Sequence, residues 1–294
     1  MDHNGDSIEN PPFSADGSRG PGRNIFVLSG GGSRGAGQVG MLRALLGAGV
    51  APDVLIGGSV GAINAAFMGA DPSADQVERL ADRWMTMTST TLTGERRSAL
   101  ANLARRRAFL FTSDRMRKVL NAWLPAERLE DLKVPVRVAT TCLTTGRAVH
   151  HDRGNLTDLI CASTALPAVF PPVVMDGDDG PVTHVDAGIA ENLPMSGAYA
   201  IARPGDRIYA LDVTKTPLPR LLRNPLDVLI AALVATVRNQ SFGTPPPGVE
   251  VVHLKLDESF DCGPVFDFSH TGTLFRLGEQ CATAALVASL PAAA

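Results

Sequence analysis

The sequence lacks an apolar run long enough to span a membrane. Its longest strongly apolar stretch, Val228–Val237, covers ten residues, whereas a membrane-spanning helix needs about 20. The first residues, MDHNGDSIENPPFS, include acidic side chains and no apolar core segment, so they do not indicate a secretory signal. We therefore expect a cytoplasmic protein.

Cysteine is scarce, and neither sign of charge dominates. Cys142, Cys161, Cys262 and Cys281 show no C-x-x-C spacing, which argues against a disulfide scaffold and a zinc site and favours a reducing compartment. The chain has 27 Lys and Arg against 30 Asp and Glu, a net charge of −3, which gives no overall attraction to nucleic acid. We expect no metal, no organic cofactor and no nucleic-acid partner.

The remaining composition is typical of a globular enzyme. The 294 residues, 45% of them hydrophobic and 19% charged, are enough for one large α/β domain. Residues 1–23 contain three prolines, four glycines and few large apolar side chains. Such a segment buries too little surface to offset its ordering entropy. We expect a disordered tail at 1–23 and one domain at 24–294.

Short apolar runs followed by glycines predict a parallel sheet with helical crossovers. The runs at 25–28 and 54–56 predict buried strands, and each is followed by a glycine turn and a helix, at 39–46 and 62–68. Further helices are predicted from Asp71-Pro72 through Met87 and at 116–123, 225–238 and 274–289, a hairpin at 136–143 and 148–151, and strands at 183–185, 208–213 and 249–256. This order is typical of a three-layer α/β/α domain with a mostly parallel sheet.

The clearest local motif is Gly57-Gly58-Ser59-Val60-Gly61, a G-x-S-x-G pattern between a predicted strand and a helix. A serine at such a turn adopts a strained backbone, and Gly57 and Gly61 avoid clashes around it. The helix N-terminus favours negative charge nearby. The pattern predicts Ser59 as a nucleophile; the alternative is a small-residue turn whose serine caps the helix.

A second glycine-rich loop, Gly30-Gly31-Gly32-Ser33-Arg34-Gly35, also joins a strand to a helix. It fits the dinucleotide pattern G-x-G-x-x-G, but the acidic residue at the expected distance, Asp53, precedes the second strand instead of closing it. Backbone amides of these six residues suit an oxyanion hole better. The alternative is a tight turn. Arg34 is interpreted as a loop organiser or phosphate contact, or equally as a surface arginine.

A serine nucleophile needs a base, and an aspartate stands out as the candidate. None of the six histidines has a recognisable Ser–His–Asp context, whereas Asp186 follows an apolar strand and precedes the small residues Ala187 and Gly188. That position places Asp186 at the same edge of the predicted sheet as the two glycine-rich loops. An ordinary turn aspartate is the alternative.

Together these motifs resemble the patatin-like phospholipases. Family members carry G-G-G-x-R-G, G-x-S-x-G and D-G-G or D-G-A in this order, as the chain does at Gly30–Gly35, Gly57–Gly61 and Asp186–Gly188. The stretch Cys161–Pro172 also resembles the family's A-S-x-A-x-P-x-x-F-P-P, and the resemblance covers roughly residues 24–213. Ala187 departs from the motif by replacing its central glycine, and a positive φ there would be strained.

The resemblance implies a patatin-like domain, a Ser59–Asp186 dyad without histidine and a lipid ester substrate, in particular a phospholipid. Ser59 would attack the carbonyl, Asp186 would accept its proton, and water would hydrolyse the acyl-enzyme. A carboxylate is a weaker base than imidazole, so the oxyanion donors, each worth about 2.7–4 kcal/mol, carry much of the catalysis. Apolar neighbours such as Val185 would make Asp186 more basic.

Three other functions stay open on the sequence alone. The first is an α/β-hydrolase-type esterase that uses His253 or His270 as its base, although no lipase-type His-Gly motif precedes Ser59. The second is a nucleotide-binding oxidoreductase built on Gly30–Gly35. The third is a lipid-binding module without turnover.

The segment from Gly94 to Leu120 is strongly basic. It has a net charge of +6 from two anions and eight cations, namely Arg96, Arg97, Arg105, Arg106, Arg107, Arg115, Arg117 and Lys118. Phe109 and Phe111 are interleaved with these charges. The pattern predicts a peripheral contact between Arg96–Arg107 and an anionic membrane, with the two phenylalanines near the headgroups. The alternative is a solvated helical face.

Overall fold

The computed structural model describes residues 22–93, 99, 101–102, 104–124, 126–177, 180–214, 225–257 and 260–288. Residues 1–21 of the expected tail, and Arg96 and Arg97 of the basic segment, lie outside the described residues. Arg23, which we assigned to the tail, is held in place. Its Nη2 lies 2.7 Å from Asp206 Oδ2, and its backbone N–H donates to Asp206 Oδ1 at 3.0 Å.

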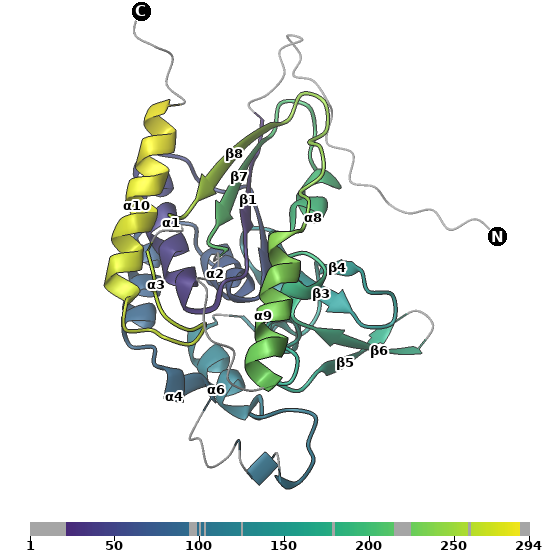
Figure 1. Ribbon diagram of the computed structural model, residues 1–294. Coiled ribbons are helices and arrows are strands. Elements are labelled where there is room, and N and C mark those ends of the chain that lie inside the picture. Colours follow the sequence, from purple (N-terminus) through teal and green to yellow (C-terminus); the bar gives the residue numbers. More distant parts are fainter. Residues whose placement is uncertain are drawn as a thin grey trace, which may run out of the picture.

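A single eight-stranded sheet runs through the described chain (Figure 1). The strands are β1 (Asn24–Leu28), β2 (Val54–Gly58), β3 (Val136–Cys142), β4 (Ala148–His151), β5 (Val173–Gly177), β6 (Gly180–Val185), β7 (Arg207–Asp212) and β8 (Glu250–Lys255). Their order is β5-β6-β3-β2-β1-β7-β8, and β4 pairs with β3. The pairs that join β3, β2, β1, β7 and β8 are parallel, whereas β4, β5 and β6 pair antiparallel. The predicted mostly parallel sheet is confirmed.

The central strands are apolar on both faces because helices cover both sides of the sheet. Side chains of a strand alternate between its faces. Phe26 and Leu28 of β1 accordingly pack into the larger core, and Ile25 and Val27 pack into the smaller one on the other face. The sequence shows this arrangement as a continuous apolar run, not as an alternating one.

The helices form two unequal layers. The larger core is covered by helices that include α1 (Gly35–Gly47), α2 (Val60–Gly69), α3 (Ala74–Met85), α7 (Leu156–Ser163) and α10 (Thr271–Ala288), and the smaller core by α8 (Met195–Tyr199). α1 and α10 are in close contact, since a Cβ at Gly40 would overlap the carbonyl oxygen of Phe275. The predicted three-layer architecture is confirmed, although the helical layer over the smaller core is thin.

The described chain also contains the helices α4 (Ser89–Thr93), α6 (Asp114–Trp123) and α9 (Pro225–Arg238). Figure 1 shows α4 and α6 at the lower end of the molecule, where α9 also ends. No helix among the described residues has the length and apolar character needed to cross a bilayer.

Several element boundaries differ from the sequence prediction. The helix expected from Asp71-Pro72 begins at Ala74, because the Ser73 side chain caps it by accepting the N–H of Gln76 at 3.2 Å. The strand expected at 183–185 is the longer β6, which pairs with β5. β5, α7 and α8 were not predicted, since each is short and gives little periodic signal.

Candidate active site

Ser59 occupies a sharp turn between β2 and α2. Its backbone has φ 53° and ψ −123°, a region that side-chain-bearing residues occupy only under strain. A Cβ at Gly57 would overlap the backbone of Gly61, and a Cβ at Gly61 would overlap the carbonyl oxygen of Leu28. The flanking glycines therefore permit the turn, as the motif predicts.

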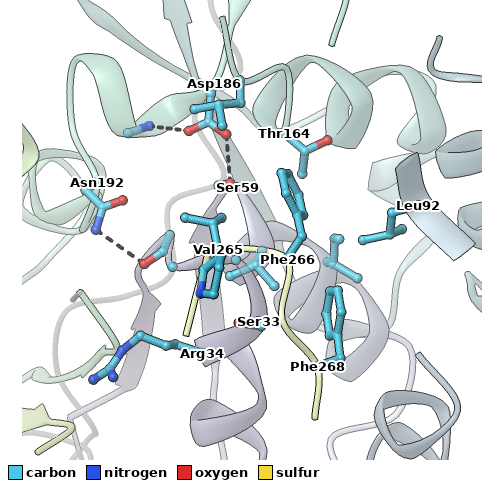
Figure 2. Close-up of a pocket in the computed structure, with 18 of the residues that line it drawn as sticks. Ser33, Arg34, Ser59, Leu92, Thr164, Asp186, Asn192, Val265, Phe266 and Phe268 are labelled. Carbon is cyan, nitrogen blue, oxygen red and sulfur yellow. Dashed lines mark hydrogen bonds between the residues drawn. The ribbon is translucent and has the colours of Figure 1, made fainter. Parts of the chain in front are cut away.

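The structure brings Ser59 and Asp186 into direct contact (Figure 2). Ser59 Oγ donates to Asp186 Oδ2 at 2.8 Å, and the Gly188 N–H donates to the other carboxylate oxygen, Oδ1, at 2.8 Å. Burial raises the pKa of Asp186 to about 6, although the hydrogen bonds from Gly188 and Ser59 lower it in part. The carboxylate is thus a stronger base than an exposed aspartate.

Ala187 fits its position without backbone strain. It begins a 3₁₀ turn at Ala187–Ile189. Ser59, Arg106 and Ala168 are the non-glycine residues with positive φ in the described chain, so Ala187 is not among them. The strain that a positive φ would have caused is absent here, and Gly188 keeps its hydrogen bond to Asp186.

The glycine-rich loop lines the same cavity as the pair, but most of its amides are engaged. The N–H of Gly30 donates to Asn192 O at 2.8 Å, that of Ser33 to Val265 O at 2.7 Å and that of Arg34 to Gly31 O at 3.2 Å. The Gly35 N–H bonds back to the carbonyls of Gly32 and Ser33. Within the described residues, only the amides of Gly31 and Gly32 in this loop have no acceptor. The oxyanion hypothesis therefore narrows from six residues to these two.

Arg34 is buried, so the interpretation as a surface arginine is wrong. It is 1% exposed, and Figure 2 shows its side chain directed away from Ser59 and Asp186. Nε donates to Val213 O at 2.9 Å, and Nη2 donates to Asp257 O at 3.3 Å. Arg34 therefore ties the glycine-rich loop to the segments that follow β7 and β8.

Asn192 is a site residue that the sequence analysis did not single out. Its carbonyl accepts the Gly30 N–H, and its Nδ2 donates to Gly30 O at 3.3 Å and to Thr214 Oγ1 at 2.7 Å. It thereby fixes the glycine-rich loop against the segment that follows Asp186. The sequence feature that could have identified it is its position six residues after Asp186.

An apolar cavity opens beside Ser59. Its apolar lining comes from α3, α4, α6, α9 and three loops, and consists mainly of Trp84, Met87, Leu92, Met116, Val119, Trp123, Leu166, Phe170, Val234, Val237, Phe266 and Phe268. Polar groups gather at one end, around Ser59, Asp186 and Asn192 (Figure 2). An apolar pocket with a few convergent polar groups is typical of a binding site for an apolar ligand.

The rival site residues lie elsewhere. His253 Nε2 is 3.0 Å from Asp212 Oδ2, the His270 ring packs against Phe260, and neither histidine lines the cavity. Asp53 accepts the Asn24 N–H at 2.7 Å, at the start of β1 and so at the edge of the sheet opposite the glycine-rich loop. Among the residues that the structure describes, no cluster of three His, Cys, Asp or Glu side chains could hold a metal ion.

Comparison with known proteins gives one family and a set of distant relatives. Residues 26–199 match the family described as patatin-like phospholipase. The chain is 31% identical over 189 residues to patatin-like phospholipase domain-containing protein 7 of Rattus norvegicus and 29% identical over 188 residues to protein 6 of that series in Homo sapiens. Each match covers 64% of this chain and 13% of the relative, so the chain spans a small part of their length. VipD from Legionella pneumophila aligns with 94% of this chain and 69% of its own, at 13% identity and a TM-score of 0.46.

Proposed function

Because the chain belongs to the patatin-like phospholipase family of lipid acyl hydrolases, we propose that it hydrolyses ester bonds of phospholipids or related lipids with Ser59 as nucleophile and Asp186 as base. The observation that carries this proposal is the 2.8 Å hydrogen bond from Ser59 Oγ to Asp186 Oδ2. The apolar cavity beside that bond supports a fatty acyl chain as the group that is bound.

In the proposed mechanism Ser59 Oγ attacks the ester carbonyl carbon while Asp186 Oδ2 accepts the hydroxyl proton. Negative charge develops on the former carbonyl oxygen, and the amides of Gly31 and Gly32 are the donors available to it. When the intermediate collapses, the carbonyl–alkoxy bond breaks and the leaving alcohol takes the proton from Asp186. Water then attacks the acyl-enzyme carbonyl while Asp186 accepts one of its protons. The acyl–Oγ bond breaks, Ser59 Oγ takes that proton back from Asp186, and the fatty acid is released.

The test of the nucleophile is covalent labelling. A fluorophosphonate probe phosphonylates an activated serine, because it mimics the tetrahedral intermediate of acyl transfer. We expect the probe to label the wild-type protein on Ser59, identified by mass spectrometry of the labelled peptide. A label on another serine would contradict the assignment.

For the membrane contact, the described part of the basic segment offers Arg105, Arg106 and Arg107, which are exposed. Just after them, Leu110 N–H donates to Ala168 O and Phe111 N–H to Val169 O, both at 2.9 Å. These bonds fix the basic segment beside Leu166 and Phe170, which line the cavity. A bilayer bound at the arginines would therefore lie near the site.

Phe111 does not support the insertion that we expected from the sequence. Its ring packs on that of Phe170, with ring centroids 6.5 Å apart, and it lies against the larger core. Insertion into a bilayer would break this contact. The proposed membrane contact therefore rests on the arginines and, of the two phenylalanines, on Phe109, which is half-buried and is not part of the larger core.

Changing Arg105, Arg106 and Arg107 together to glutamine should weaken binding to anionic liposomes. Each basic residue near the surface contributes about 1 kcal/mol, so the loss should be about 100-fold and should shrink as salt is added. Hydrolysis of a short, water-soluble ester should be unchanged. A matched control changes three exposed arginines elsewhere, Arg147, Arg153 and Arg203. Equal liposome binding by the two triple variants would contradict the proposal.

A further inference from the structure

One buried hydroxyl links the strained turn at Ser59 to the central sheet. Ser163, the last residue of α7, is 0% exposed. Its Oγ accepts the backbone N–H of Ser59 at 2.8 Å and donates to the carbonyl oxygen of Ala139 in β3 at 2.6 Å. Ser163 therefore bridges the candidate nucleophile and β3.

The turn that follows Ser163, together with β3, also holds Asp186. The Asp186 N–H donates to Ala165 O at 3.0 Å, and Thr141 Oγ1 of β3 donates to Asp186 O at 2.8 Å. Both members of the Ser59–Asp186 pair are thus fixed to one frame, formed by residues 163–165 and the end of β3. The separation of the two side chains depends on this frame.

The bond from Ser163 matters because Ser59 needs outside support. Backbone strain at a residue with positive φ costs on the order of 1–3 kcal/mol and persists only where the surroundings enforce it. Ser59 is the N-cap of α2, so its own N–H has no acceptor within the helix. Ser163 Oγ supplies that acceptor, and without it the half-buried N–H would be unpaired.

We infer that Ser163 is a positioning residue, whose hydroxyl holds the backbone of Ser59 in the conformation that aims Oγ at Asp186. The inference rests on the proposed function, because it assigns a role in the same reaction. Ser163 touches neither the substrate nor the Ser59 hydroxyl in this scheme. Its loss should therefore slow the chemical step more than it weakens substrate binding.

Three variants separate positioning from stability. Ser163→Ala removes the hydroxyl. Ser163→Thr keeps it and adds a methyl group, which should destabilise a fully buried position. Thr140→Val removes a neighbouring buried hydroxyl of β3, which pairs with His151 Nε2 and His184 Nδ1, both at 2.9 Å, and not with the Ser59–Asp186 pair.

The variants are compared by kcat and KM on a soluble ester, by the rate of fluorophosphonate labelling and by thermal melting. We expect Ser163→Ala to lose about 100-fold in kcat, as small misplacements do, with KM nearly unchanged and with slower labelling. Ser163→Thr should recover most of the kcat although it melts lower than the wild type. Thr140→Val should melt lower and keep its kcat.

Each alternative outcome has a distinct meaning. A wild-type protein that takes no label and hydrolyses no ester overturns the proposed function and this inference with it. A labelled wild type together with an unchanged kcat in Ser163→Ala overturns the inference alone. The inference also fails if folded Ser163→Thr is as inactive as Ser163→Ala, or if Thr140→Val loses as much kcat as Ser163→Ala.

Discussion

Replacing Ser59 with alanine is expected to abolish lipid hydrolysis while the fold is kept. The side chain makes one hydrogen bond, to Asp186 Oδ2 at 2.8 Å, so its removal disturbs few contacts. Without Oγ no acyl-enzyme can form, and loss of a serine nucleophile in such enzymes costs about 10⁴-fold or more in kcat. The measurement is fatty acid release from phospholipid vesicles and from a soluble ester, with circular dichroism as the check of folding.

Ser196→Ala is the matched control for this experiment. Ser196 is exposed and lies outside the lining of the cavity, so its loss should leave turnover unchanged. Full activity in Ser59→Ala would move the nucleophile to another residue. It would also remove the basis for the role of Asp186.

The local motifs were predictable because their geometry depends on neighbouring residues. A short apolar run, small residues and a helical pattern are enough to predict the turn at Ser59, and the positive φ of Ser59 follows from that turn. The glycine-rich loop is predictable in the same way. Its position at the end of β1 follows from the strand that precedes it.

Asp186 lies at the predicted edge of the sheet, but the strand that brings it there runs in a different direction from the one we expected. We placed it there as the residue that follows a strand, but β6 runs antiparallel to β3. The pairing with β3 covers only Thr141–Val185 and Cys142–His184, so β6 enters from beyond the end of β3 and stops at the same edge. Strand register decides this outcome, and no local pattern in the sequence encodes it.

The details that narrow the site depend on contacts between distant segments. The Gly30 amide is engaged by Asn192 and the Ser33 amide by Val265, and Arg34 is buried against the carbonyls of Val213 and Asp257. Ser163 likewise meets Ser59 across 104 residues. Such pairs form only once the sheet is assembled, so the sequence alone could not separate engaged amides from free ones.

Replacing Asp186 with asparagine should remove nearly all turnover and leave Ser59 in place. The amide is close to isosteric, and its oxygen can still accept the Gly188 N–H, but its NH₂ group would face Ser59 Oγ as a donor and cannot accept the proton. Loss of the acidic member of such a catalytic group costs about 10⁴-fold in kcat. The measurement is kcat on a soluble ester, with the two histidine variants His253→Ala and His270→Ala expected to keep most activity.

The pH profile tests the same assignment in the unmodified protein. Burial raises the pKa of Asp186 to about 6, and only the ionised carboxylate can accept a proton from Ser59. The rate kcat/KM should therefore be highest above that pH and fall about tenfold for each pH unit below it, since protonation removes the base. His253→Ala and His270→Ala should keep this profile. A histidine variant as inactive as Asp186→Asn, or one that abolishes the fall near pH 6, would assign the base to that histidine instead.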